Sequence, residues 1–387
     1  MKKGGVIHDY IKKMKNIQKH ILQFLDDDSN QEENYQILIS YIIDLKIIDN
    51  KKEIKEILNL ILHISNNYHH SPIFFSQIDR ILAFFKNEIQ DCFSNFDLFH
   101  FFRKNKRILL FLFEEKLLIP DRTIYRYILN NDKYKRRNYL QYFYPEFKTF
   151  FSQKTIPRLC KDDNELFKQK RKAGENDKYI CNLIRNDDVD EFVTYVNRTN
   201  LPLSTVIEQS IFETNQFLYD KNPTLIEYAA FFGSIQIFKY LYFLNIELTP
   251  SLWLYLIHGK NPELIHLIEE HIQPKNDPDP ELVHLLEKLS NIQPNVFYNE
   301  CLIESIKCHH NEIANYFIIN FIQNQDDDDD DVYSNIYAKS IKYNNYEFFP
   351  KNLNSELVFY NLCKYYYLTL VEFLLEMTHI DINSLVI

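Results

Sequence analysis

The clearest periodic pattern of apolar and polar positions lies in residues 224–248. Apolar residues recur every three or four positions over 225–232 and again over 237–241, on either side of Gly233-Ser234. This spacing is typical of amphipathic helices, and a Gly-Ser pair is typical of a turn. The segment is therefore predicted to be a helical hairpin, in which Ala229-Ala230 would let a second helix approach closely.

Helical periodicity also dominates the rest of the chain. It predicts an N-terminal helical region over 1–95, which fits both eroded repeats and a separate domain. A second helical region over 96–176 contains apolar pairs that resemble degenerate repeats, and its most polar part, 152–176, is predicted to be a basic connector. The third region, 177–387, is predicted to be an array of repeated hairpins.

The hairpin pattern recurs from residue 177 onward. Five further segments each pair two apolar runs around a polar turn, and aligning them with Gly233 gives the turn residues Asp187, Lys260, His309, Asn344 and Tyr366. The positions equivalent to Ile237 recur at a mean spacing of about 33 residues, namely at Leu264, Ile313, Phe348 and Leu370. Because one hairpin cannot bury both of its faces, neighbouring hairpins are expected to stack, with 362–377 as the terminal cap.

The segment 224–248 resembles one ankyrin repeat. It matches the pattern of that family at Thr224, Ala229, Ala230, Gly233, Ile237, Phe238 and Leu241, and departs from it at Leu225, Glu227, Ser234, Tyr240 and Asn245. The resemblance implies an all-α, ankyrin-like solenoid of helical hairpins whose usual function is protein–protein interaction. The region 96–150 is similar in texture to divergent ankyrin proteins of the type expanded in some parasitic protists.

The resemblance also implies a recognition surface. In ankyrin repeats the two residues after the alanine pair often face the concave groove. Carried onto this sequence, these positions give the candidate protein-binding residues Phe231, Phe232, His258, Lys307, Lys342, Tyr343, Lys364 and Tyr365. They are aromatic and basic, and such residues often anchor interfaces. The alternative is that the two phenylalanines pack beneath a neighbouring loop.

Composition argues against catalysis. The chain has 387 residues with 45% hydrophobic and 15% aromatic content, so a large core is available. Five glycines leave little room for phosphate-binding loops, and the sequence contains no nucleophile elbow, Walker motif or zinc-protease motif. We therefore expect no catalytic residues, no cofactor and no small-molecule substrate.

Charge supports a second hypothesis. The chain carries a net charge of −10, yet residues 101–180 hold 20 Lys and Arg against 10 Asp and Glu. Such a region is either a solvated basic face or a site for an acidic partner. The alternative function is thus a nucleic-acid-associated regulator that uses region 101–180. The run Lys168 to Lys172 loosely matches a nuclear localisation or anion-binding patch.

Metal binding and membrane insertion are not predicted. Neither of the two Cys/His groups has a paired Cys-x-x-Cys spacing, the first being Cys301, Cys308, His309 and His310 and the second His63, His69 and His70. The run Asp326–Asp331 lacks the spacing of a calcium loop and is predicted to be a disordered loop. The six scattered cysteines are expected to be reduced thiols of a cytoplasmic protein. The apolar run 108–113 is too short to span a bilayer, and no secretory signal is predicted.

Overall fold

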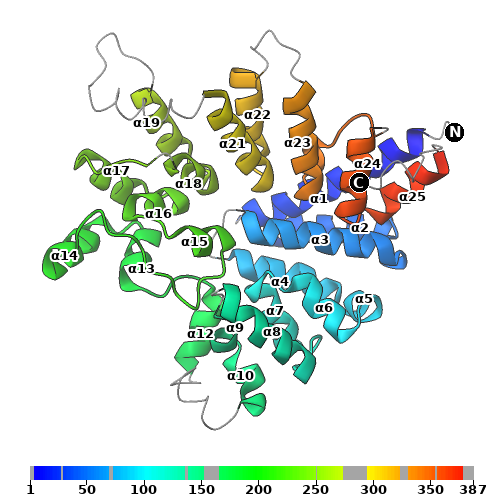
Figure 1. Ribbon diagram of the computed structural model, residues 1–387, viewed down its shortest axis with the longest axis horizontal. Helices are drawn as coiled ribbons and strands as arrows, with labels where there is room; N and C mark the ends of the chain where they lie inside the picture. The colour runs from blue at the N-terminus through cyan, green and yellow to red at the C-terminus, as the bar shows by residue number, and fades with distance from the viewer. Residues whose placement is uncertain are drawn as a thin grey trace. The chain divides into compact units, whose positions relative to one another are not determined.

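The computed structural model describes residues 4–27, 29–68, 73–135, 138–151, 165–249, 251–272, 294–322, 330–353 and 355–377. All regular elements in these residues are helices, apart from one isolated bridge between Val206 and Thr224 (Figure 1). The all-α prediction is confirmed. His69-His70, positions 152–164 of the predicted connector and positions 326–329 of the aspartate run lie outside the described residues.

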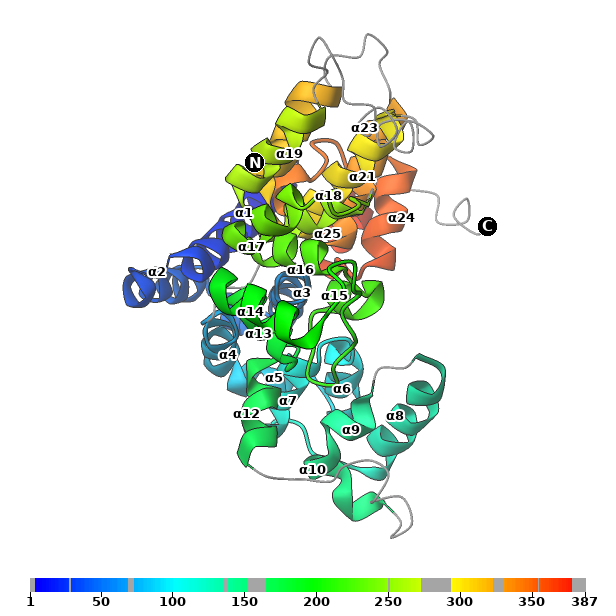
Figure 2. The ribbon, with the colours of Figure 1, turned by 90° about the vertical axis from the view of Figure 1, so that its left-hand side faces the viewer.

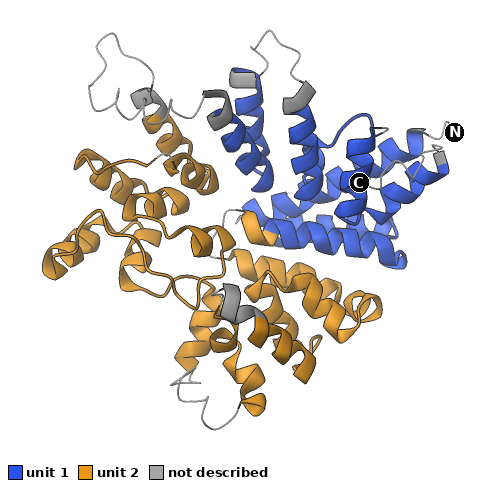
Figure 3. Cartoon of the chain, in the orientation of Figure 1, with its two compact units in different colours: residues 1–64, 271–387 blue, residues 65–270 orange. Residues whose placement is uncertain are grey.

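The chain forms two compact units (Figure 3). Unit 1 comprises Met1–Ile64 together with His271–Ile387, and unit 2 comprises Ser65–Glu270. The three regions predicted from the sequence, 1–95, 96–176 and 177–387, follow one another along the chain. Unit 1 instead joins the two ends of the chain, so residues far apart in the sequence share one core.

The first half of unit 2 is built around α7 (Lys106–Glu114). Positions 106–113 of this helix are all buried, because α4 (Phe74–Phe84), α6 (Asn95–Phe102) and α12 (Glu165–Ala173) pack around it (Figure 2). The remaining elements here are α5 (Lys86–Cys92), α8 (Arg122–Lys135), α9 (Tyr139–Tyr142), α10 (Tyr144–Phe147) and the 3-10 turn η2 (Lys148–Phe150). The longest apolar run of the sequence is therefore a core helix.

The second half of unit 2 contains three helical hairpins. Hairpin 1 is α13 (Tyr179–Arg185) with α14 (Val189–Thr199), hairpin 2 is α16 (Leu225–Phe232) with α17 (Ile235–Phe243), and hairpin 3 is α18 (Leu252–Gly259) with α19 (Pro262–Ile272). The short helix α15 (Gln216–Lys221) precedes hairpin 2. Thr224 and Glu227 form a capping box that fixes the start of α16.

Unit 1 contains three further hairpins. Hairpin 4 is α21 (Pro294–Lys307) with α22 (Asn311–Phe317), which continues into the π-turn η3 (Ile318–Ile322); hairpin 5 is α23 (Asp330–Lys342) with η4 (Tyr346–Phe348); hairpin 6 is α24 (Glu356–Lys364) with α25 (Leu368–Met377). The N-terminal helices α1 (Gly4–Asp26), α2 (Gln31–Asp44) and α3 (Lys51–Asn67), with η1 (Ile47–Asp49), complete the unit.

All six turn residues that the sequence alignment selected adopt left-handed backbone conformations. Their φ angles are positive, at Asp187 51°, Gly233 66°, Lys260 50°, His309 58°, Asn344 56° and Tyr366 64°. A left-handed residue just after a helix closes its last carbonyls. In hairpin 2, for example, the Ser234 N–H donates to the Ala229 carbonyl at 2.9 Å. The predicted turn positions are confirmed, although only one of them is glycine.

Consecutive hairpins within each unit are joined by a repeated hydrogen bond. The side chain just after one turn donates to the carbonyl three positions before the turn residue of the preceding hairpin. The three cases are Ser234 Oγ to Ile184 O at 2.5 Å, Asn345 Nδ2 to Ile306 O at 2.9 Å and Tyr367 Oη to Ile341 O at 2.7 Å. Hairpin 3 uses a variant, Asn261 Nδ2 to Gly233 O at 3.3 Å. The hairpins therefore stack in register within each unit.

The helices α1 and α3 lie across the turns of hairpins 5 and 6 in unit 1 (Figure 1). Gln18 Oε1 accepts from the Tyr346 N–H at 2.7 Å, and Glu56 Oε1 accepts from the Thr369 N–H at 3.0 Å. Gln18 thereby satisfies the N–H of the first residue of η4, and Glu56 satisfies an N–H in the first turn of α25. The N-terminal helices thus complete the C-terminal hairpins.

Candidate functional site

Two of the predicted binding residues, Phe231 and His258, lie in the core of unit 2. Phe231 is 1% exposed and His258 is 0% exposed. The ring of Phe231 stacks on His258 with centroids 5.1 Å apart and on Phe217 of α15 at 6.0 Å. Phe232 is half-buried, with the Arg185 guanidinium 5.9 Å from its ring centroid. Phe231 therefore follows the alternative reading, since it packs beneath a neighbouring segment and is not exposed to a partner.

The other five predicted residues come together in unit 1. Lys307, Lys342 and Lys364 are the last residues of α21, α23 and α24, two positions before each left-handed turn. They thus occupy the same place in three consecutive hairpins. A lysine in the last turn of a helix also interacts favourably with the helix dipole, which gives these positions a structural role as well.

Tyrosines accompany the lysines on hairpins 5 and 6. Lys342 Nζ lies 4.9 Å from the ring centroid of Tyr343. Lys364 Nζ lies 5.3 Å from the centroid of Tyr360 and 5.8 Å from that of Tyr365. These are cation–π contacts. Tyr360 was not among the predicted residues, although its spacing of four from Lys364 on one helix would have indicated the contact.

Tyr366 is the most exposed of these side chains. It is 77% exposed, and it holds the left-handed turn position of hairpin 6, where a bulky residue is unusual. The sequence alignment identified Tyr366 only as a turn residue. An aromatic side chain that is both strained in its backbone and open to solvent points to a role outside the fold. We name the set Lys307, Lys342, Tyr343, Tyr360, Lys364, Tyr365 and Tyr366 the lysine–tyrosine surface.

The charge of the lysine–tyrosine surface is only partly balanced. Lys307 pairs with Glu304 at 2.7 Å. Burial by itself would lower the pKa of Lys307, but Glu304 together with Cys308 and Tyr343 raises it above its usual value. Lys342 and Lys364 form no ion pair within the described part of the chain. Nearby, burial and the charge of Lys342 lower the pKa of Lys339. Two ammonium groups are therefore left without a carboxylate partner in a chain of net charge −10.

The parts of this surface are held in a fixed relation. The helices α23 and α24 pack against each other, and Tyr367 Oη donates to the carbonyl of Ile341, the residue before Lys342. Tyr343 also packs edge-on against His63 of α3, with ring centroids 6.0 Å apart. The hairpin stack therefore positions the surface, and no long loop within the described residues carries it.

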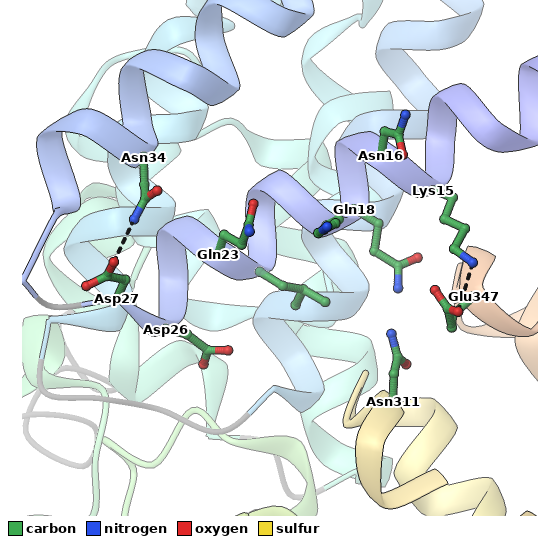
Figure 4. A pocket seen from close by; sticks show the side chains of 11 residues that line it. Lys15, Asn16, Gln18, Gln23, Asp26, Asp27, Asn34, Asn311 and Glu347 are labelled. Atoms are coloured by element: carbon green, nitrogen blue, oxygen red, sulfur yellow. Dashed lines mark hydrogen bonds and ion pairs between the residues drawn. The ribbon is translucent and has the colours of Figure 1, made fainter. Parts of the chain in front are cut away.

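A second candidate is a groove of about 480 Å³ between α1, α22 and η4 (Figure 4). Its charged groups are largely matched within unit 1: Lys15 pairs with Glu347 at 2.8 Å, and Asn34 donates to Asp27 at 3.1 Å. Hydrogen bonds from Ser29 and Asn30 hold the pKa of Asp27 well below its usual range. The remaining lining residues are Asn16, Gln18, Lys19, Leu22, Gln23, Asp26 and Asn311. This lining selects no particular ligand class.

Three cations of the basic region 101–180 are buried inside unit 2. Lys106, Arg107 and Arg171 are each at most 6% exposed. Lys106 Nζ lies 4.7 Å from the ring centroid of Tyr219, and Arg171 pairs with Glu146 at 2.8 Å. The run 168–172 is part of α12, and its lysines pair with the carboxylates Glu165, Asp177 and Glu114. These contacts stabilise the fold, whereas Lys116, Arg122 and Arg126 of the same region are exposed and accessible to a nucleic acid.

The Cys/His groups considered for metal binding have structural environments. Cys301 and Cys308 are buried, and burial raises the pKa of both thiols, which disfavours the thiolate that a metal requires. His309 is 2% exposed and contacts the Tyr343 carbonyl through Nε2 at 3.1 Å. Burial and His63 lower the pKa of His309 to about 3. Of the second group, His63 lies among the described residues, whereas His69 and His70 lie outside them.

Within the described residues, none of the helices combines the length and apolar character needed to cross a membrane. The cysteines at 92, 181, 301, 308 and 363 are free thiols. Comparison of the chain with protein-family models, with curated proteins and with solved structures gave no match in any of the three.

Proposed function

We propose that this protein is a non-catalytic, cytoplasmic scaffold that binds a protein partner through stacked helical hairpins of the ankyrin type. The observation that carries the proposal is the lysine–tyrosine surface. Lys307, Lys342 and Lys364 stand at one equivalent position in three consecutive hairpins. Tyrosines accompany two of them, the half-buried Tyr343 beside Lys342 and the exposed Tyr360 beside Lys364. Tyrosine is enriched at protein interfaces, and a repeat stack presents such positions in a row.

The alternative, a nucleic-acid-associated regulator using region 101–180, has less support. Lys106, Arg107 and Arg171 of that region are buried and make contacts within unit 2. Binding to phosphates needs accessible cations, because the affinity comes from releasing counterions. Accessible cations are present in both regions, at Lys116, Arg122 and Arg126 in unit 2 and at Lys364 in unit 1, so an experiment has to separate the two hypotheses.

Affinity capture with the tagged full-length chain from its native cell extract, after nuclease treatment, tests the proposal. We expect a small set of proteins to be retained, and the variant Lys342→Glu/Lys364→Glu to lose them. The control Lys12→Glu/Lys351→Glu makes the same charge change at exposed lysines elsewhere in unit 1 and should keep them. Equal retention by both variants would exclude the lysine–tyrosine surface.

A titration with salt separates the two hypotheses. If the captured material is lost on nuclease treatment and binding of a nucleic acid falls steeply with salt, the scaffold proposal is wrong and the regulator hypothesis gains support. Circular dichroism and thermal melting of each variant establish that it is folded. None of the four lysines forms an ion pair with a described residue, so each variant should stay folded. Lys342→Glu/Lys364→Glu should melt slightly lower, because a glutamate at the end of a helix opposes the helix dipole.

A further inference from the structure

The lysines of the lysine–tyrosine surface have a regular spacing. Lys307, Lys342 and Lys364 end the first helices of hairpins 4, 5 and 6, and turn-to-turn hydrogen bonds join hairpin 4 to 5 and hairpin 5 to 6. Packed helices lie about 8–10 Å apart. We therefore expect the row to repeat a cation at about that interval. Two of its members, Lys342 and Lys364, pair with no carboxylate among the residues that the structure describes.

The tyrosine rings limit what the row can bind. Lys364 Nζ lies over the rings of both Tyr360 and Tyr365, and Lys342 Nζ lies over Tyr343. Single-stranded nucleic acids bind such surfaces by stacking bases on open aromatic faces. Here ammonium groups already occupy a face of three of the four rings, and the fourth, Tyr366, is 77% exposed. The surface instead offers N–H donors beside phenol hydroxyls, which fits carboxylate groups.

We propose that this surface binds an extended acidic segment of a protein partner, in which carboxylate side chains recur about every three residues. A chain in the polyproline II conformation advances about 3.1 Å per residue and has three residues per turn, so every third side chain lies on the same face and its carboxylates recur about every 9 Å, which matches the usual distance between packed helices. The inference rests on the proposed scaffold function and adds the chemistry of the partner. Glu304 already holds Lys307, so Lys342 and Lys364 make the main contacts.

The spacing of the carboxylates in the partner matters because each single ion pair is weak. An exposed ion pair contributes little by itself, because water and salt screen it. Several pairs formed at once along a fixed row contribute together, since the first contact brings the second within reach. A peptide whose carboxylates match the row is therefore bound more tightly than one with the same charge bunched at one point.

Fluorescence anisotropy with the full-length protein tests this inference. The probes are three labelled peptides of equal length: one with three Glu residues spaced by two neutral residues, one with the three Glu residues adjacent, and one with Gln in place of each spaced Glu. We expect the spaced peptide to bind at least about threefold more tightly than the bunched one, and the Gln peptide to lose at least about tenfold. The protein is unchanged in this comparison, so misfolding cannot affect it.

The variant Lys342→Glu/Lys364→Glu should lose at least about tenfold in affinity for the spaced peptide, whereas Lys12→Glu/Lys351→Glu should not. Equal binding of the spaced and Gln peptides would overturn the inference, as would tighter binding of an oligothymidine probe that is lost in the first variant. If no acidic peptide binds but the wild-type chain still captures proteins from the extract, only the partner chemistry is wrong. If nothing is captured either, the scaffold function is wrong too.

Discussion

At the scale of single residues, the left-handed turn positions link the sequence to both fold and surface. Five of the six hairpins in the described residues close on a residue other than glycine, which explains how a chain with only five glycines can hold so many tight turns. Asp and Asn tolerate this conformation better than most residues. Tyr366 tolerates it poorly, and it is 77% exposed, so the fold gains little from its ring.

Replacing Tyr366 with glycine should therefore stabilise the protein and weaken binding. Glycine adopts a φ of +64° without strain, so the free energy of unfolding should rise by up to about 1 kcal/mol. Urea unfolding followed by circular dichroism measures this change. Gly233→Ala, at the equivalent turn with φ +66°, is the matched control and should lose a similar amount. A loss of stability in Tyr366→Gly would mean that its ring supports the fold.

His309 predicts a pH dependence of unit 1. Its pKa is about 3 in the folded protein, lowered by burial and His63, against a usual value of 6.5. Between these values the unfolded chain binds a proton that the folded chain does not. Stability should therefore fall as pH falls from about 6.5 towards 3. The variant His309→Asn, which also tolerates the left-handed turn, should lose less stability over this range in denaturant titrations.

The control for this titration is His8→Asn, because His8 is exposed on α1. The free energy of unfolding of this variant should follow the wild-type curve at every pH. The contributions of the other ionisable groups are then the same in both proteins and cancel in the comparison. If His309→Asn and wild type also lose stability in parallel on acidification, the buried imidazole does not couple folding to pH.

At the scale of elements, the close approach of α16 and α18 explains the paired alanines of the sequence. A Cβ atom added to Gly259 would lie 2.1 Å from the Ala230 carbonyl oxygen, which is backbone and cannot move aside cheaply. Gly259→Ala should therefore destabilise unit 2 by about 1–3 kcal/mol, measured by chemical denaturation. Gly5→Ala is the control, because an added Cβ there meets nothing within 4 Å. Equal stability of the two variants would contradict this packing.

The hairpins could be predicted from the sequence to a large extent, and their surface only in part. Apolar periodicity predicted both helices of hairpin 2, and aligning the hairpins predicted all six turn residues. Such predictions succeed because helices and turns depend mainly on local sequence. Burial depends on neighbours, so the sequence could not show that α15 covers Phe231. The predicted terminal cap 362–377 exposes Leu368 and Leu375, although a cap usually has a polar outer face.

At the scale of the whole molecule, the sequence could not show that unit 1 joins both ends of the chain. Gln18 and Tyr346 are 328 residues apart, and Glu56 and Thr369 are 313 apart. No local pattern records a contact at that separation. Two physical effects stabilise the N-terminal helices against hairpins 5 and 6. Their side chains accept hydrogen bonds from N–H groups that need a partner, and α1 buries the apolar residues Met14, Ile17 and Ile21.

Deleting residues 1–64 tests this arrangement. The deletion removes Gln18 and Glu56, so hairpins 5 and 6 lose their caps and the cover over their turns. The stack should loosen, and Cys308 in hairpin 4, which is 0% exposed in the intact unit, should react readily with a thiol reagent. Cys181 is equally buried but lies in unit 2, and it should stay protected. Mass spectrometry of the labelled chain assigns each site. Protection of both thiols in the deleted chain would instead support an N-terminal region that folds separately, because hairpins 4 to 6 would then need no help from α1 and α3.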